Sequence, residues 1–146
     1  MGNPCSSDSL NYLFIQVAKA HRARTHELLS TVGLHVGQEM ILVSLRMEDG
    51  QTLSQLAERL EVQPPTITKM VQRMEVSGII KREASQEDNR VSHVFLTNKG
   101  KNLQAKIEKV WEQVEREFVL GMSREEKLVF QKLLIKAKES LGKVMI

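Results

Sequence analysis

The segment 63–74 carries basic and amide side chains but no carboxylate. Within it, Lys69 and Arg73 are four residues apart, a spacing that on a helix brings like charges close enough to repel. Lysine and arginine bind phosphates and guanine edges, while glutamine and threonine, here Gln72 and Thr68, also bond to base edges. These residue types predict a surface that contacts the major groove of DNA. A solvated helix face with two cations is the alternative interpretation.

A helix from about Pro65 to Val76 is expected to carry these side chains, because proline is well tolerated in the first helical turn. At about 100° per residue, apolar side chains fall on one arc of this helix and polar side chains on the other. The apolar arc comprises Ile67, Met70, Val71 and Met74, and the polar arc comprises Pro65, Thr68, Lys69, Gln72 and Arg73. The apolar arc is expected to pack on a core.

A shorter helix is expected just before it. Thr52 and Gln55 have the spacing of a capping box, which predicts a helix of about eight residues beginning at Leu53. Its apolar side chains recur at spacings of three and four, at Leu53, Leu56, Ala57 and Leu60. Residues 61–63 then form the turn between the two helices.

A β-hairpin is expected after Gly78, since glycine commonly ends a helix. Residues 79–83 and 91–96 are rich in strand-forming side chains, and a polar loop separates them. Arg90 in that loop is of the type that enters a narrow minor groove while the preceding helix occupies the adjacent major groove. Asp88, two residues earlier, is placed to hold its guanidinium group.

The charges of this hairpin balance when His93 is neutral. The cations are Lys81, Arg82 and Arg90, and the acids are Glu83, Glu87 and Asp88. We therefore expect most of the affinity for DNA to come from the helix and from Lys81 and Arg82. An ordinary hairpin that covers a core is the alternative.

These motifs together resemble the MarR (multiple antibiotic resistance regulator) family. The resemblance is carried by TLSQLAERLEVQPPTITKMVQRMEVSGIIKRE for the helix pair, by EDNR with its Asp-x-Arg pattern at Asp88 and Arg90, and by LTNKG at 96–100. It implies a mainly α fold with a small β-hairpin wing, a winged helix-turn-helix flanked by dimerisation helices. It also implies that Arg90 lies at the wing tip and that the recognition helix presents Pro65, Thr66, Thr68, Lys69, Gln72 and Arg73.

The resemblance implies one MarR-like domain over 1–146, with a DNA-binding part at 34–97 and dimerisation helices at 9–30 and 98–146. Apolar stripes in the outer segments fit this division, at Leu10, Leu13, Phe14, Val17 and Leu28, at Leu103, Ile107, Val110, Trp111, Val114 and Phe118, and at Leu128, Leu133, Leu134, Ala137 and Leu141. A helix is also expected at 36–47, Thr97 is expected to cap the long helix after it, and Ser123 begins a capping box. An intrachain bundle would satisfy the same stripes, but the resemblance favours a homodimer on a pseudo-palindromic operator.

Composition agrees with a small DNA-binding protein. The chain has 146 residues, 41% hydrophobic content and a formal net charge of +3, which permits contact with nucleic acid without proving it. The polar segment 1–9 does not resemble a signal peptide, and no apolar run approaches the length of a membrane span. We predict a cytoplasmic protein that does not enter membranes.

A chemical role for the single cysteine or the histidines has little support. Cys5 cannot close an intrachain disulfide, and it precedes the first expected helix, so a redox-sensing repressor using Cys5 is kept as an alternative only. His21 and His26 are five residues apart and diverge on a helix, and no cysteine or carboxylate cluster supplies a zinc ligand spacing. No cofactor, metal or enzymatic activity is predicted, since no nucleophile with a base and no phosphate loop occurs.

A small aromatic or anionic effector is the last partner that the resemblance implies. Phe14, Val17 and Met40 are candidates for lining a crevice, and His21 and Arg24 offer cationic groups to it. A plain core role for the apolar residues is the alternative.

The predicted function is a sequence-specific, double-stranded-DNA-binding transcriptional regulator, most simply a homodimeric repressor relieved by an effector. A winged-helix module for protein or RNA contact is the alternative, favoured by the acids of the wing. A flat response to salt would support a partner that is not nucleic acid, because binding to nucleic acid releases counterions.

Overall fold

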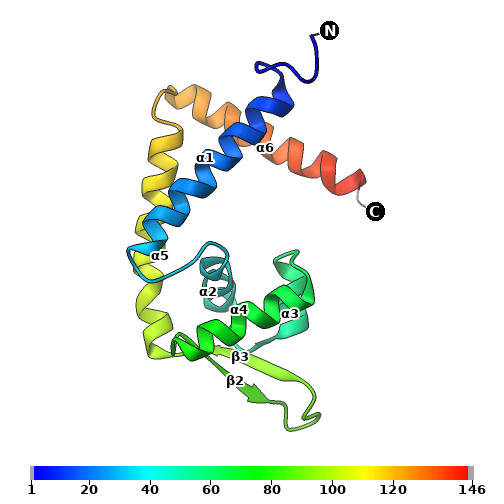
Figure 1. The fold of residues 1–146 in the computed structure, drawn as a ribbon, viewed down its shortest axis with the longest axis vertical. Helices are drawn as coiled ribbons and strands as arrows, with labels where there is room; N and C mark the ends of the chain where they lie inside the picture. Colours follow the sequence, from blue (N-terminus) through cyan, green and yellow to red (C-terminus); the bar gives the residue numbers. More distant parts are fainter. Residues whose placement is uncertain (1, 145–146) are drawn as a thin grey trace. The chain divides into compact units, whose positions relative to one another are not determined.

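The computed structural model describes residues 2–144, so the last two residues of the predicted segment 98–146 lie outside the described residues. The chain separates into two compact units, Met1–Trp111 and Glu112–Ile146. Six helices and three strands are described in 2–144 (Figure 1): α1 (Leu10–Ser30), α2 (Gln38–Met47), β1 (Gln51–Thr52), α3 (Leu53–Arg59), α4 (Pro64–Val76), β2 (Ile80–Ala84), β3 (Ser92–Leu96), α5 (Asn98–Phe118) and α6 (Arg124–Val144). The fold is mainly helical, as the sequence predicted.

Side-chain caps start the helices where the sequence predicted them. The Thr52 hydroxyl accepts the Gln55 N–H at 3.1 Å while the Gln55 side chain accepts the Thr52 N–H at 2.8 Å, which completes the capping box of α3. Thr97 caps α5 by accepting the Gly100 N–H at 3.2 Å. Ser123 and Glu126 form the second predicted capping box, at the start of α6. These boundaries therefore depend on local sequence.

The sheet has one strand more than the predicted hairpin. Its order is β1-β3-β2, and both pairings are antiparallel. The third strand, β1, is only two residues long, and its Gln51 lies opposite Val94 of β3. The Gln51 side chain is buried, and its amide donates to the Ser44 carbonyl at 2.9 Å and to the Glu48 carbonyl at 2.7 Å. This buried amide ties the end of α2 to the sheet.

The predicted strand and helix boundaries are displaced by one or two residues. Strand β2 begins at Ile80, not at 79, because the Ile79 N–H closes the end of α4 by donating to the Met74 carbonyl at 3.0 Å. Helix α2 begins at Gln38, not at 36, because Gly37 before it has a φ of 101°, outside the helical region. Helix α4 includes Pro64 as its first residue.

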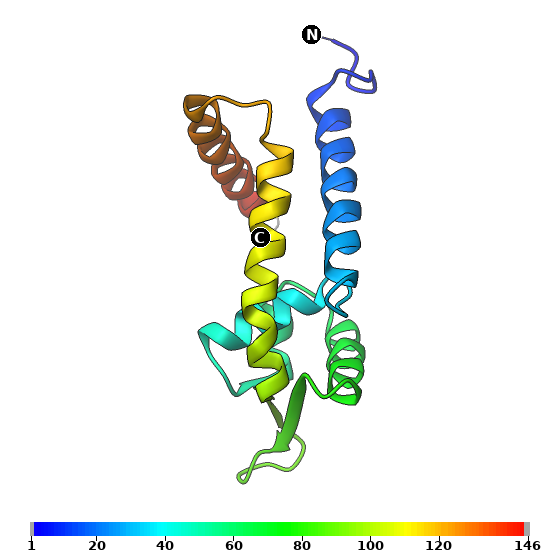
Figure 2. The same cartoon turned by 90° about the vertical axis from the view of Figure 1, so that its left-hand side faces the viewer.

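The core of the first unit lies between α2, α3, α4, α5 and the sheet. Its fully buried side chains include Leu42, Leu45, Leu56, Ile67, Val71, Met74, Ile80, Val94 and Ile107. Within this unit α1 extends away from the sheet, whereas the β2–β3 hairpin projects on the other side (Figures 1 and 2). The hairpin is therefore free to contact a partner beyond the helices.

The first half of α1 is not buried within the chain. Its apolar side chains Leu10, Leu13, Phe14 and Val17 are 90%, 48%, 61% and 48% exposed, and burial on α1 is confined to Thr25 and Leu29 near its end. The apolar stripe predicted on this helix is therefore largely exposed in the single chain. No helix within residues 2–144 is long and apolar enough to cross a membrane.

At Gly100, helix α5 closely approaches the backbone of Ile79, just before β2. A Cβ added there would lie 2.2 Å from the Ile79 carbonyl oxygen, which is backbone and cannot move aside cheaply. We expect Gly100→Ala to destabilise the protein by about 1–3 kcal/mol, the usual range for an overpacked site. Urea unfolding followed by circular dichroism at one protein concentration measures this change. Gly121→Ala is the matched control, since a Cβ there meets no atom within 4 Å, and an equal loss in both variants would contradict the clash.

Candidate nucleic-acid interface

The outer face of α4 is the surface that the sequence predicted to contact DNA. Ile67, Val71 and Met74 are fully buried, which turns the opposite side of the helix outward. The exposed side chains are Pro65, Thr66, Lys69, Gln72, Arg73 and Val76, while Thr68 is half-buried. The Thr68 hydroxyl donates to the Pro64 carbonyl at 3.0 Å, so its hydrogen is already used within the first turn. The predicted apolar arc is thus confirmed at Ile67, Val71 and Met74, whereas its fourth member, Met70, is half-buried.

A tight turn sets α4 beside α3. Glu61 has a φ of 53°, in the left-handed region, and the Val62 N–H donates to the Ala57 carbonyl at 3.0 Å. Gln63 then stands as the N-cap of α4 without a side-chain bond to the helix. The two helices therefore form the compact pair that the turn at 61–63 predicted.

Cations on α4 and on the hairpin differ in their partners. Among residues 2–144, Lys69 and Arg73 form no ion pair. Lys81 pairs with Glu83 at 3.1 Å and lies 5.9 Å from the centre of the Phe95 ring. The positive charge of α4 is therefore not offset by a bound carboxylate, whereas that of Lys81 is.

Arg82 is engaged with an acid that the sequence analysis did not assign to it. Its guanidinium donates to Glu75 at 3.0 and 3.3 Å, and its backbone N–H donates to the same carboxylate at 3.2 Å. These bonds, the Arg82 side chain first, hold the pKa of Glu75 below its ordinary value. They join the end of α4 to β2. The only sequence signal for the pair is that Glu75 is the first acid after the acid-free segment.

At the tip of the hairpin, Asp88 holds Arg90 as the sequence predicted. The Asp88 carboxylate accepts the Arg90 backbone N–H at 3.0 Å and its Nε–H at 3.1 Å. The backbone bond, followed by the side-chain bond, lowers the pKa of Asp88. The Arg90 side chain is nevertheless 90% exposed. An oriented but exposed guanidinium at a projecting tip suits contact with an anionic surface.

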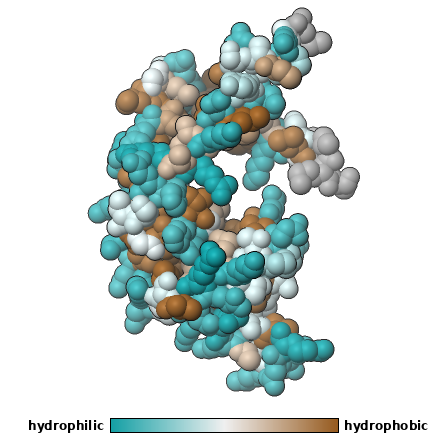
Figure 3. Space-filling view, in the orientation of Figure 1, coloured by the Kyte–Doolittle hydropathy of each residue, from teal (hydrophilic) through white to brown (hydrophobic). Residues whose placement is uncertain are grey.

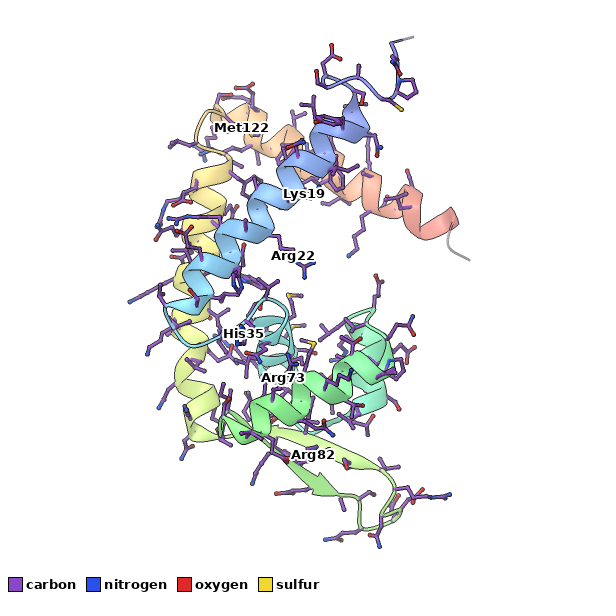
Figure 4. The ribbon with its side chains drawn as sticks, in the orientation of Figure 1. Lys19, Arg22, His35, Arg73, Arg82 and Met122 are labelled. Carbon is purple, nitrogen blue, oxygen red and sulfur yellow. The ribbon has the colours of Figure 1, made fainter. Side chains whose placement is uncertain are left out.

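A hollow lies between α4 and the α1–α2 loop, with a volume of about 590 Å³. It is lined by Gly33, His35, Gln38, Lys69, Gln72, Arg73, Val76 and Ser77. Figure 4 labels two of these residues, His35 of the α1–α2 loop and Arg73 of α4. The sequence analysis assigned the α4 side of this hollow to DNA contact but missed His35 and Gln38. Nothing in the local sequence links them to α4, about 30 residues further along the chain.

The residues proposed for an effector lie on α1 and α2. Phe14, Val17 and Met40 are exposed, and Arg24 donates to Glu27 at 2.9 Å. Phe14, Val17, His21 and Arg24 share one side of α1 by their spacing. None of the five residues lines the hollow beside α4.

Cys5 and the histidines form no evident reactive centre. Cys5 is a free, exposed thiol. Within the described residues there is no group of three or more metal-ligating side chains. His93 bonds through Nδ1 to the Gly50 carbonyl at 2.8 Å, and His26 stacks on His35 with ring centres 6.3 Å apart.

Comparison with known proteins agrees with this geometry. Residues 34–92 match the model of the MarR family. The HTH-type transcriptional regulator TtmR of Methylorubrum extorquens (strain PA1) is 31% identical over 107 residues, which are 73% of this chain and 55% of that protein. The HTH-type transcriptional repressor MdtR of Bacillus subtilis (strain 168) is 34% identical over 74 residues, 51% of this chain and 48% of that protein. The matches thus span about half the length of these two relatives.

Solved structures share the fold over nearly the whole chain. A crystal structure of MarR superposes with a TM-score of 0.82 at 24% identity, covering 98% of this chain and 97% of that one. The S. aureus MepR–DNA complex superposes with a TM-score of 0.81 at 23% identity, covering 90% and 98%. The α3–α4 pair and the β2–β3 hairpin therefore form a winged helix-turn-helix. The hairpin is called the wing below. Residues 34–92, which contain the α3–α4 pair and strand β2 and match the family model, belong to the MarR family.

The Glu75–Arg82 pair predicts a specific response to acid. Because the folded pKa of Glu75 is lowered, the pair stabilises the fold above the ordinary glutamate value of about 4.3 and loses that effect as the pH falls through the folded value. We expect Glu75→Gln to be less stable than the parent protein near neutral pH and to approach it in acid. Urea unfolding midpoints of both proteins, measured from neutral pH down into the acid range, test this expectation. A difference that stays constant with pH would contradict the ionic role of Glu75.

Proposed function

We propose that this protein is a sequence-specific DNA-binding regulator of transcription. The observation that carries the proposal is the outer face of α4, which is exposed, contains no acid and has Lys69 and Arg73 without ion pairs among the described residues. Gln72 and Arg73 supply the side chains that pair with adenine and guanine edges. Membership of residues 34–92 in the MarR family and the regulators among the chain's relatives support the same reading.

The wing extends the proposed contact to the minor groove. Arg90 projects at its tip, and Asp88 limits the directions that the guanidinium adopts. A narrow minor groove has the most negative potential along the duplex, so it attracts such an arginine. Lys81 and Arg82 are proposed as phosphate contacts near the base of the wing. Their acidic partners, Glu83 and Glu75, reduce what each of them contributes.

A homodimer is the second part of the proposal. Both α1 and α6 carry exposed apolar side chains, and Leu10, Phe14, Leu128, Leu133 and Leu141 are each more than half exposed among the described residues. Figure 3 shows such hydrophobic residues at the surface among hydrophilic ones. Exposed apolar clusters of this kind mark protein interfaces. A two-fold dimer then places two copies of α4 on successive major grooves, about 34 Å apart, on a pseudo-palindromic operator.

Repression and its relief by an effector complete the proposed mechanism. A dimer on an operator that overlaps a promoter competes with polymerase. MdtR, which this chain resembles, is described as a repressor. A small aromatic or anionic effector would act from the side of α1 bearing Phe14, Val17, His21 and Arg24, with Met40 of α2. It relieves repression only if it binds the released state more tightly than the DNA-bound state. A regulator of this type acts in the cytoplasm.

Selection of duplexes from a random pool tests the proposed function. A palindromic sequence bound by a dimer, with affinity that falls steeply with salt, supports it. If no sequence is enriched and the binding of the protein to duplexes does not respond to salt, the alternative of a protein partner is favoured. Enrichment from an RNA pool instead would point to an RNA-binding module.

Substitution of Arg73 tests base reading by α4. We expect Arg73→Ala to weaken binding to the selected operator by about 1–3 kcal/mol and to relax the preference at one base position. Fluorescence anisotropy with the operator and its single-base variants measures both effects. Lys106→Ala, which removes an exposed cation on α5, is the control. Equal weakening on all duplexes would mean that Arg73 contacts only phosphate.

A charged substitution on the apolar face of α1 tests the proposed dimer. We expect Leu13→Asp to shift the protein from dimer to monomer, because a carboxylate would be buried in the interface without a partner. Lys19→Asp places the same carboxylate on the side of α1 opposite Leu10, Phe14 and Val17 and should leave the dimer intact. Sedimentation equilibrium over a range of concentrations reports the change. If both variants stay dimeric, this face of α1 is not the interface.

A further inference from the structure

We propose that the hollow between α4 and the α1–α2 loop seats a backbone phosphate of DNA, with His35 as a proton-dependent contact. The inference rests on the proposed function, because it adds a phosphate site to the DNA-binding surface. It assigns a role to two residues, His35 and Gln38, that lie outside the winged helix-turn-helix helices and the wing.

The composition of the hollow favours an anion. Among its lining residues Lys69 and Arg73 are cationic, His35 becomes cationic on protonation, and none is acidic. Lys69 and Arg73 have no carboxylate bound to them within the described residues. Positive side chains that converge in a concave surface attract phosphate more strongly than the same charges spread over a flat one.

The position of the hollow favours DNA as the source of the phosphate. One wall is α4 itself, so a duplex whose major groove receives Gln72 and Arg73 would bring its backbone along the rim. A guanidinium has five N–H donors and can contact a base edge and a phosphate together. The presence of Arg73 in the wall therefore agrees with its proposed base contact.

The opposite wall is built to present polar groups. Gln38 is buried, and its side-chain oxygen accepts the His35 backbone N–H at 3.1 Å. That bond holds the loop residue against α2 and orients the Gln38 amide, whose nitrogen carries two N–H donors. His35 is exposed and stacks on His26 of α1, with ring centres 6.3 Å apart and planes inclined by 23°. The stacked ring restricts the orientations of His35.

The groups around His35 set the sign of the pH dependence. From α1 it faces His26, from α4 it faces Lys69 and Arg73, and the nearest acid along α2 is Glu39. Glu39 is buried, accepts the Gly37 N–H at 2.8 Å, and has a pKa that burial raises. A bound phosphate favours the charged form of a neighbouring imidazole, so the proposed contact couples DNA binding to proton uptake by His35.

Variants of His35 test the inference on the operator selected with the parent protein. The parent protein should bind about three- to tenfold more tightly at about pH 6 than at about pH 8, the effect of gaining one charge-assisted contact. His35→Ala should lose this difference. At the lower pH its salt dependence should be weaker than that of the parent protein by about one phosphate contact for each hollow. His35→Arg should keep the tighter binding at both pH values, because its charge is permanent.

His26→Phe is the matched control, since it keeps a ring stacked on His35 and removes the other titrating group. It should retain the pH dependence of the parent protein. If His35→Ala keeps the parent's pH dependence and salt dependence, or if His26→Phe abolishes the pH dependence, the inference is wrong. A parent protein that selects no duplex would instead refute the proposed function. Unchanged urea midpoints in the three variants exclude loss of folding as the cause.

Discussion

Burial of Ile67, Val71 and Met74 sets the rotation of α4 about its axis, and every DNA contact proposed for α4 depends on that rotation. A turn of about 100° would exchange exposed cations for apolar side chains. Two connections hold the helix at its ends. The turn at Glu61 joins it to α3, and the Glu75–Arg82 pair joins it to β2. A shared core thus holds the outer face of α4 and the wing in one orientation.

Charge pairing divides the surface into parts with different roles. On the wing, Lys81, Arg82 and Arg90 each contact a carboxylate, so their net field is small. On α4, Lys69 and Arg73 have none among the described residues, and the hollow beside them adds His35. The affinity for DNA is therefore expected to come mainly from α4 and the adjacent hollow, while the wing is expected to orient the protein on the duplex through Arg90. Surface ion pairs contribute little to stability, so the exposed Lys81–Glu83 and Asp88–Arg90 pairs are better understood as contacts that orient the two cations.

The exposed apolar side chains of α1 and α6 give a reason for a second copy of the chain. A single chain leaves Leu10, Phe14 and Leu141 largely in water, a cost that association removes. The same association would supply the two-fold symmetry that a palindromic operator requires. Stability and recognition are then linked through one interface.

The sequence by itself determined the features that depend on neighbours within one or two helical turns. These are the capping boxes at Thr52 and Ser123, the N-cap at Thr97, the two arcs of α4 and the Asp88–Arg90 contact. Only the tertiary structure decided the strand β1, the engagement of Arg82 by Glu75, the close approach of Gly100 to Ile79, and the joining of His35 to α4 in one hollow. Capping and helical periodicity act over three to four residues and can be read along the chain. The second group joins residues that meet only when the core brings their elements together, which no local pattern encodes.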